Sequence, residues 1–204
     1  MDFEHVKAVF EEYLNGYDRE NDKVKLKIVH TYGVIRCSEE IGRRMGLQAE
    51  DMELAKLIAL LHDIGRFEQL KRFNSFEADT MDHATYGVKV LFEEGMIRQF
   101  IEEDTWDDVI RTAIAKHSDY ELTGITDERT LLHARLIRDA DKLDNCRVKL
   151  EDAMETLLDL RMRWESTQFH RKYVKMHLRE NASVPKTGEP RWITGFPMWH
   201  IFMI

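Results

Sequence analysis

The sequence has little that would interrupt helices or cross a membrane. All three prolines (Pro185, Pro190 and Pro197) fall in the last twenty of 204 residues, so the preceding chain lacks the strongest helix breaker. No run approaches the roughly 18 uncharged apolar residues typical of a transmembrane helix. The acidic start MDFEHVKAVFEEY lacks the basic beginning and apolar run of a signal peptide. We expect a soluble helical protein with no membrane partner.

The sequence also has few cysteines and no net positive charge. The two cysteines, Cys37 and Cys146, cannot staple a chain of this length, and as small buried side chains they suit a cytoplasmic protein. The formal net charge of −8 argues against broad binding of nucleic acid through its phosphates. We therefore expect no nucleic-acid partner, while a homo-oligomer stays open.

The positive charge that is present gathers near the C-terminus. Residues 161–204 hold 8 Lys and Arg against 3 Asp and Glu, a net charge of +5. This segment is either a solvated helix face beside an acidic body or a basic rim that attracts an anionic substrate. His170 and His177 share a face of the predicted basic helix and are expected to meet solvent or a partner.

Apolar residues recur at three- and four-residue steps, as in Leu26, Val29 and Gly33, which predicts amphipathic helices. Alternating β-branched runs, the mark of a sheet, are absent. The expected helices lie near 2–15, 22–46, 50–64, 80–94, 96–103, 105–118, 127–160 and 162–180. The predicted fold is a single all-α domain over 1–204, ending in a basic helix and an aromatic tail.

Start and stop signals set the expected helix boundaries. Thr105 followed by Asp108 resembles a capping box, and Asp79 or Thr80 is placed to cap the helix that contains His83. Helix ends are expected at three glycines, because glycine readily adopts the left-handed conformation that ends many helices. They are Gly46, Gly95 and Gly124.

The candidate functional residues are histidines and aspartates that lie on or at the ends of apolar helix faces. His62 and Asp63 end the apolar helix in LIALLHDIGR, so a charged Asp63 near the interior needs a partner such as a divalent cation. His30, His117 and Asp141 each follow an apolar residue by about one helical turn. Taken alone, a histidine on an apolar helix face is more often a hydrogen-bonded residue of the core than a metal ligand. The gaps between them, however, suit helices that return to one point inside a bundle.

The order of these residues resembles the HD-domain superfamily of metal-dependent phosphohydrolases, whose signature is a His, a His-Asp pair and a later Asp. His30 in VHTYG, His62-Asp63 in LLHDIGR and Asp141 in IRDADKLDN match that order. The sequences of these segments are similar to those of a branch of the superfamily that consists of stand-alone bacterial proteins. The resemblance covers about residues 22–160 and implies an HD-domain helical bundle.

The resemblance also implies a metal centre with one or two divalent transition ions (Mn, Fe, Co, Ni or Zn), which suit imidazole and carboxylate donors. One ion would be held by His30, His62, Asp63 and Asp141. His83 and His117 match two further histidines of two-metal members, and Asp63 would then bridge the ions. Ser118 departs from phosphodiesterase members, which often have a histidine there, and this leaves the occupancy of the second site open.

The activity implied is hydrolysis of a phosphate ester or phosphoanhydride by metal-activated water, on a small phosphorylated, nucleotide-like substrate. Asp63, Arg66 and Lys142 are the expected catalytic residues in this interpretation. Arg66 and Lys142 are candidates for binding the substrate phosphate, the alternative being ion pairs with Glu68 or Asp144.

Supporting roles are also expected. Asp82 and Asp139 are candidates for orienting histidine ligands, a role that spacing alone does not show. His133, eight residues before Asp141, is expected to be structural.

The motif is also compatible with two other functions. The same six residues are similar to those of diiron oxygenases of the superfamily, such as the myo-inositol oxygenase type, which cleave C–H or C–P bonds. A non-catalytic nucleotide-binding regulatory module is the third reading, although such members usually lose ligands.

Overall fold

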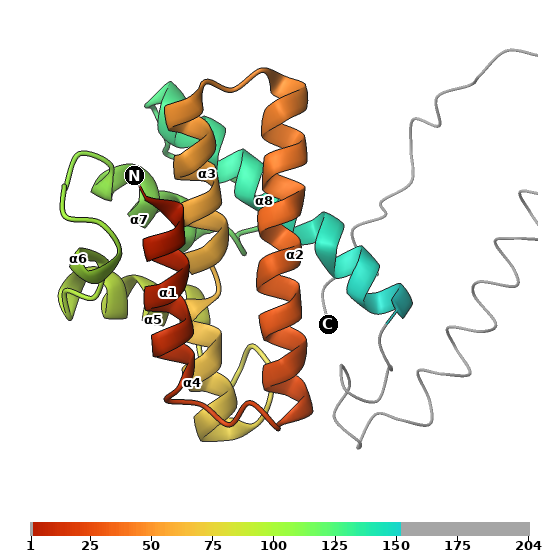
Figure 1. Ribbon diagram of the computed structural model, residues 1–204. Coiled ribbons are helices and arrows are strands. Elements are labelled where there is room, and N and C mark those ends of the chain that lie inside the picture. The colour runs from red at the N-terminus through yellow and green to blue at the C-terminus, as the bar shows by residue number, and fades with distance from the viewer. Residues whose placement is uncertain (1, 152–204) are drawn as a thin grey trace, which may run out of the picture. The chain divides into compact units, whose positions relative to one another are not determined.

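The computed structural model describes residues 2–151, in which the secondary structure is helical and contains no strand (Figure 1). The all-α expectation is confirmed for this part of the chain. The predicted helix 162–180, the aromatic tail and the extension of the single domain to residue 204 lie outside the described residues. The helices are α1 (Phe3–Leu14), α2 (Asp22–Met45), α3 (Ala49–Leu61), α4 (Ile64–Phe73), α5 (His83–Val88), the π-helical turn η1 (Lys89–Glu93), α6 (Ile97–Phe100), α7 (Asp107–Lys116) and α8 (Glu128–Glu151).

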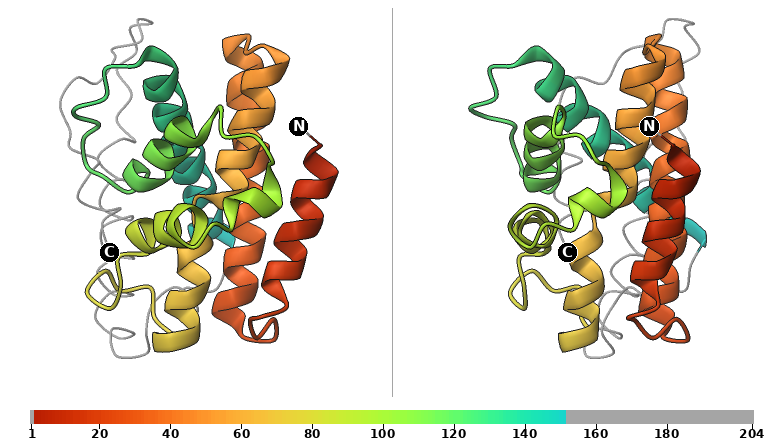
Figure 2. Two further views of the ribbon diagram at one scale, coloured as in Figure 1. Left: turned by 90° about the vertical axis from the view of Figure 1, so that its left-hand side faces the viewer. Right: turned by 60° about the vertical axis from the view of Figure 1, so that its left-hand side comes forward.

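Helices α1, α2 and α3 lie side by side, and α8 crosses behind α2 (Figures 1 and 2). Helix α2 packs against both α3 and α8, while α7 packs against α8. Helix α3 is buried along most of its length, with Leu54, Leu57, Ile58 and Leu61 almost inaccessible to solvent. None of the described helices combines the length and apolar character needed to cross a membrane.

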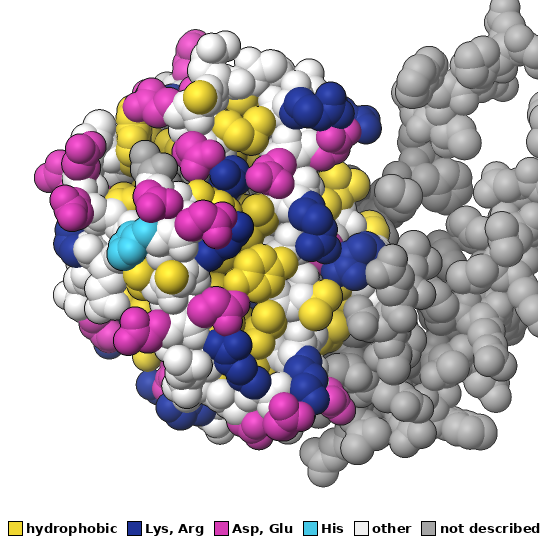
Figure 3. Space-filling view, viewed as in Figure 1, with side chains coloured by type: hydrophobic (Ala, Val, Ile, Leu, Met, Phe, Trp, Pro, Cys, Tyr) yellow, Lys and Arg dark blue, Asp and Glu magenta, His cyan; other side chains and the backbone are white. Residues whose placement is uncertain are grey.

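Side chains of both charges surround apolar side chains between α1 and α2 on the face shown in Figure 3. Beneath this surface lies an aromatic cluster. The Phe67 ring of α4 contacts Phe10, Tyr13 and Tyr17 of the N-terminal segment at centroid distances of 5.9, 6.3 and 5.7 Å. These contacts fasten the start of α4 to α1.

Helix α4 differs from the sequence prediction, which continued the third helix to residue 64 and expected no helix between residues 64 and 80. In the structure α3 ends at Leu61, the chain turns through His62 and Asp63, and a new helix follows. The residues that α4 buries include Ile64, Phe67 and Leu70, with charged residues between them. Burial against the aromatic cluster stabilises this short helix, which local apolar patterning only weakly indicates.

The caps also depart from the predictions. Helix α5 is capped by Asp82, whose carboxylate accepts hydrogen bonds from the backbone N–H groups of Ala84 and Thr85, so Asp79 and Thr80 are not its caps. The predicted capping box at Thr105 is wrong, because α7 begins after Trp106 without a side-chain cap.

The three glycines all have positive φ, but they do not all end helices. Gly46 caps α2 and Gly95 follows the π-helical turn. Gly124 lies in the connection between α7 and α8, so its predicted role as a helix end is wrong.

Gly65 allows the first turns of α4 and α5 to touch. A Cβ atom at this position would lie 2.2 Å from the carbonyl oxygen of His83 and 2.7 Å from the amide nitrogen of Gly87. Because both neighbours are backbone atoms, the clash cannot be relieved by turning a side chain. The contact holds the segment that carries Asp63 against the segment that carries His83.

We predict that Gly65→Ala lowers the free energy of unfolding by about 1–3 kcal/mol or more, because the helices must separate to admit a methyl group. Urea denaturation monitored by circular dichroism measures the loss. Gly16→Ala is the matched control, since its Cβ would have an ordinary 3.4 Å contact with the Tyr13 carbonyl oxygen. Equal stability of the two variants would contradict the close packing.

Candidate metal centre

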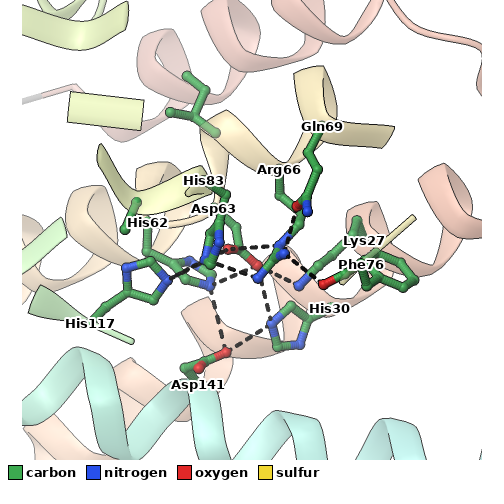
Figure 4. Close-up of polar contacts among 12 residues, drawn as sticks. Lys27, His30, His62, Asp63, Arg66, Gln69, Phe76, His83, His117 and Asp141 are labelled. Carbon is green, nitrogen blue, oxygen red and sulfur yellow. Dashed lines mark hydrogen bonds and ion pairs between the residues drawn. The ribbon is translucent and has the colours of Figure 1, made fainter. Parts of the chain in front are cut away.

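The six predicted ligands converge from six helices or their ends, one from each, and Figure 4 shows them around one centre. His30 lies within α2, and Asp141 lies within α8. The others occupy helix boundaries, where side chains can leave the helix surface. They are His62 at the C-cap of α3, Asp63 at the N-cap of α4, His83 at the start of α5 and His117 at the C-cap of α7.

One group, called here the His30 set, consists of His30, His62 and Asp141, whose potential ligand atoms lie within 4.8 Å of one another. Asp141 Oδ1 is 3.0 Å from His30 Nε2 and 3.7 Å from His62 Nε2. Asn145, one turn further along α8, donates from Nδ2 to the same carboxylate oxygen at 2.9 Å. The Asp141 oxygen is thereby directed toward both imidazoles.

The second group, the His83 set, consists of Asp63, His83 and His117 and meets the same 4.8 Å limit. Asp63 Oδ1 is 3.3 Å from His83 Nε2 and 3.6 Å from His117 Nε2. The two Nε2 atoms are 3.2 Å apart.

Asp63 connects the two sets through its two oxygens. While Oδ1 faces the His83 set, Oδ2 is 3.4 Å from His62 Nε2 and 3.8 Å from His30 Nε2. The side chain is only 4% exposed. This is the position that a carboxylate bridging two ions would occupy.

The histidine rings are oriented from behind, at Nδ1. His62 Nδ1 donates to the carbonyl oxygen of Ala59 at 2.8 Å, and His117 Nδ1 donates to that of Ile114 at 2.7 Å. In the neutral ring this leaves a lone pair on Nε2, directed into the centre. The buried His62 Nε2 has no hydrogen-bond partner within the described residues. Imidazole rings oriented in this way beside carboxylates, one of them with an unsatisfied Nε2, fit a divalent transition metal.

The centre concentrates opposite charges in a buried space. Burial acts to raise the pKa of Asp63, but the Lys27 ammonium and His62 outweigh it and hold that pKa well below its usual range. Burial also acts to raise the pKa of Asp141, but the hydrogen bond with His30 and the neighbouring His62 imidazole lower it strongly. Both carboxyl groups are therefore ionised at neutral pH.

The surroundings shift the pKa values of His62 and His83 in opposite directions. Burial lowers the pKa of His62, yet Asp63 and Asp141 overcome this effect and raise it to about 9. Burial lowers the pKa of His83 to about 3. The neighbouring Arg66 guanidinium also lowers this pKa, whereas the Asp63 carboxylate acts to raise it. Before any cation binds, His62 carries a proton at neutral pH and His83 does not.

Arg66 lies at the His83 set. Its Nη2 donates to His83 Nε2 at 3.0 Å, and its Nη1 donates to Gln69 Oε1 at 2.6 Å and to the Phe76 carbonyl oxygen at 3.2 Å. Arg66 also forms an ion pair, from Nε to Asp63 Oδ1 at 3.9 Å, so the acid that it meets is Asp63. Glu68 pairs with Arg72 and Asp144 with Arg147.

Two residues that lie beside the centre were not predicted from the sequence to belong to the site. Lys27 donates to Asp63 Oδ2, and Asp144 Oδ2 accepts from His30 Nδ1 at 2.8 Å. Each lies three residues from a predicted ligand on the same helix, Lys27 before His30 and Asp144 after Asp141. Helical spacing was therefore a usable signal for both.

The remaining predicted residues lie away from these contacts or act differently. Lys142 is exposed on α8, and its phosphate-binding role stays a prediction. Asp139 is exposed, while Asp82 serves as the cap of α5. His133 is buried and bound to Asp51 at 3.0 Å, as expected of a structural histidine.

Both cysteines are only partly buried, whereas full burial was expected. His170 and His177 lie outside the described residues.

Comparison with known proteins gives one family and one fold. The family model described as HD domain matches residues 28–146, a range that contains all six predicted ligands. A solved structure of a predicted HD superfamily hydrolase from an uncultured Thermotogales bacterium is similar, with a TM-score of 0.51. It shares 21% sequence identity with this chain, over 87% of this chain and 92% of the other. A search of curated proteins finds no match.

We predict that cation binding to metal-free protein tightens about tenfold per pH unit from pH 6 to about 9 and then levels off. A ligand imidazole must be neutral, so an ion has to displace the proton of His62, whose pKa is about 9. His83 contributes no slope in this range, because its pKa of about 3 keeps it neutral throughout. Mn²⁺ titrations followed by electron paramagnetic resonance measure the affinity, and a flat profile would contradict this protonation pattern.

Proposed function

The chain belongs to the HD-domain family, and from this premise we propose that it is a metal-dependent phosphohydrolase. Its substrate class is the phosphate ester or phosphoanhydride of a small, nucleotide-like metabolite. The observation that carries the proposal is the convergence of two ligand sets on the two oxygens of Asp63.

The His30 set, with Asp63 Oδ2, would hold one divalent ion, and the His83 set would hold a second. When bound, such ions act as Lewis acids that lower the pKa of water from about 15.7 towards about 7 and neutralise charge on phosphate oxygens. The protein's own contribution is to keep the ligand atoms in place. Backbone carbonyl groups hold the rings of His62 and His117, and Asn145 holds the carboxylate of Asp141.

Positive side chains beside the ligands suit an anionic substrate. Arg66 and Lys27 flank Asp63, with side chains 15% and 12% exposed. Lys27 carries a compact ammonium on a flexible stem, whereas the Arg66 guanidinium is fixed by Gln69 and the Phe76 carbonyl group. We infer that Lys27 contacts a substrate phosphoryl oxygen and that Arg66 supplies positive charge from a fixed position.

These two cations favour a substrate that carries negative charge. A diiron oxygenase that cleaves the C–H bond of a neutral polyol would use the same ligands without calling for two cations beside Asp63, whereas one that cleaves the C–P bond of a phosphonate would also suit them. A regulatory module that has lost its ligands is disfavoured because all six side chains are present and oriented toward one centre.

The proposal is tested by measuring metal content and phosphate release on protein purified without chelator. We expect about two equivalents of transition metal, about one in His117→Ala and almost none in Asp63→Ala, because Asp63 serves both sets. His133→Ala is the matched control, since that buried histidine lies outside the centre and its loss should leave the metal content unchanged.

Hydrolysis of at least one member of a panel of nucleotides and sugar phosphates should follow the metal content. Activity that requires iron and dioxygen would instead identify an oxygenase. A protein that takes up no metal would overturn the proposal altogether.

For the substrate with the highest activity, Lys27→Met should lower kcat/KM about 10- to 100-fold, the effect of losing one charged hydrogen bond to the phosphate. Lys56→Met is the control, because Lys56 is similarly buried at 14% exposure but pairs with Glu53 on α3. Steady-state phosphate release gives both values. Equal kinetics of the two variants would remove Lys27 from the substrate site.

A further inference from the structure

We propose that Asp144 is a positioning residue that sets how tightly the His30 set binds a metal ion. The inference rests on the proposed metal centre and adds a residue that does not itself face the ion. It follows from three features of the structure, namely the contacts of Asp144, the way the other histidines are held, and the space left by a glycine on α2.

Asp144 forms the middle of a chain of contacts that leads into the centre. Its side chain is 1% exposed, and Oδ2 accepts from Nδ1 of the equally buried His30 at 2.8 Å. Arg147 holds the carboxylate from the other side, through Nε to Oδ1 at 2.8 Å and Nη2 to Oδ2 at 3.1 Å. The far nitrogen of the imidazole, His30 Nε2, is 3.0 Å from Asp141.

This arrangement makes His30 different from His62 and His117. Those two rings donate from Nδ1 to neutral carbonyl groups, whereas His30 donates to a carboxylate. An ionised acceptor holds the Nδ1 proton more firmly, which fixes the tautomer and increases the electron density available at Nε2. His30 should therefore be the strongest imidazole donor of the three.

Gly33 provides the space that the carboxylate needs. It lies three residues after His30 on α2, and a Cβ atom there would be 1.9 Å from Asp144 Oδ1. Any larger residue would push Asp144 away from His30. The glycine thus lets α8 bring a charged group against the back of the imidazole.

The chain contains a matched pair away from the centre. Asp51 Oδ1 is 3.0 Å from Nε2 of the buried His133, and Arg129 Nε also binds Asp51, at 2.7 Å. Asp51 precedes His62 by eleven residues on α3, about 16 Å along the helix. Asp51→Asn therefore removes a carboxylate from the same kind of His–Asp–Arg arrangement without touching the ligands.

The test compares Zn²⁺ affinity of the full-length wild-type chain, Asp144→Asn and Asp51→Asn, by competition with a chromophoric chelator after metal removal. We expect Asp144→Asn to weaken one class of site about 10- to 100-fold and Asp51→Asn to change neither class more than about twofold. Asp144→Ala should weaken the site further, because asparagine still accepts the Nδ1 proton and alanine does not.

A second measurement needs no variant and therefore does not depend on how well Asp144→Asn folds. Nitrogen-15 NMR of histidine-labelled, Zn²⁺-loaded wild type should show His30 protonated at Nδ1 and bound through Nε2. Zinc bound through Nδ1, or a folded Asp144→Asn with wild-type affinity, would overturn this inference while leaving the metal centre intact. Failure of the wild type to bind Zn²⁺ would overturn both.

Discussion

The arrangement of the molecule depends on a buried carboxylate, that of Asp63. An ionised carboxyl group taken out of water is costly unless opposite charge and hydrogen bonds surround it. Here the compensation comes from Lys27 on α2 and from histidines that reach Asp63 from four segments of the chain. Each of these partners must be brought to the same point, which explains why the helix ends meet there.

The helices can meet at this point because their backbones approach closely where glycine permits. Gly65 lets the starts of α4 and α5 touch, so that Asp63 and His83 become neighbours. Gly33 on α2 instead leaves room for a side chain, the carboxylate of Asp144 on α8. The core supplies rigidity through the buried α3 and the aromatic rings around Phe67. Packing, rather than loop conformation, therefore determines where the ligand atoms lie.

Much of this could be predicted from the sequence, for a physical reason. His30, His117 and Asp141 each lie one helical turn from apolar anchors, so their helix faces could be assigned from spacing alone. Helix α4 was missed because its buried residues are separated by charged ones and its first turn contains Gly65. Its stability comes from packing against α5 and α2 and from aromatic contacts with α1, which no local pattern contains.

The neighbours of the ligands were harder to predict than the ligands themselves. Spacing shows that Asp144 shares a face with Asp141, and that Lys27 shares one with His30. It does not show which helix lies opposite that face. The contact of Asp144 with His30 joins residues 114 positions apart, and that of Lys27 with Asp63 joins residues 36 apart. Only the three-dimensional packing of α2 against α4 and α8 establishes them.

The span of these contacts has a consequence for folding. Residues 111 positions apart supply the His30–Asp141 contact, so the centre cannot assemble until the chain from α2 to α8 has closed. A partly folded chain would offer an ion only scattered single ligands. An ion bound by all of them would therefore favour the native state alone, and its binding free energy would add directly to the resistance of the whole bundle to unfolding.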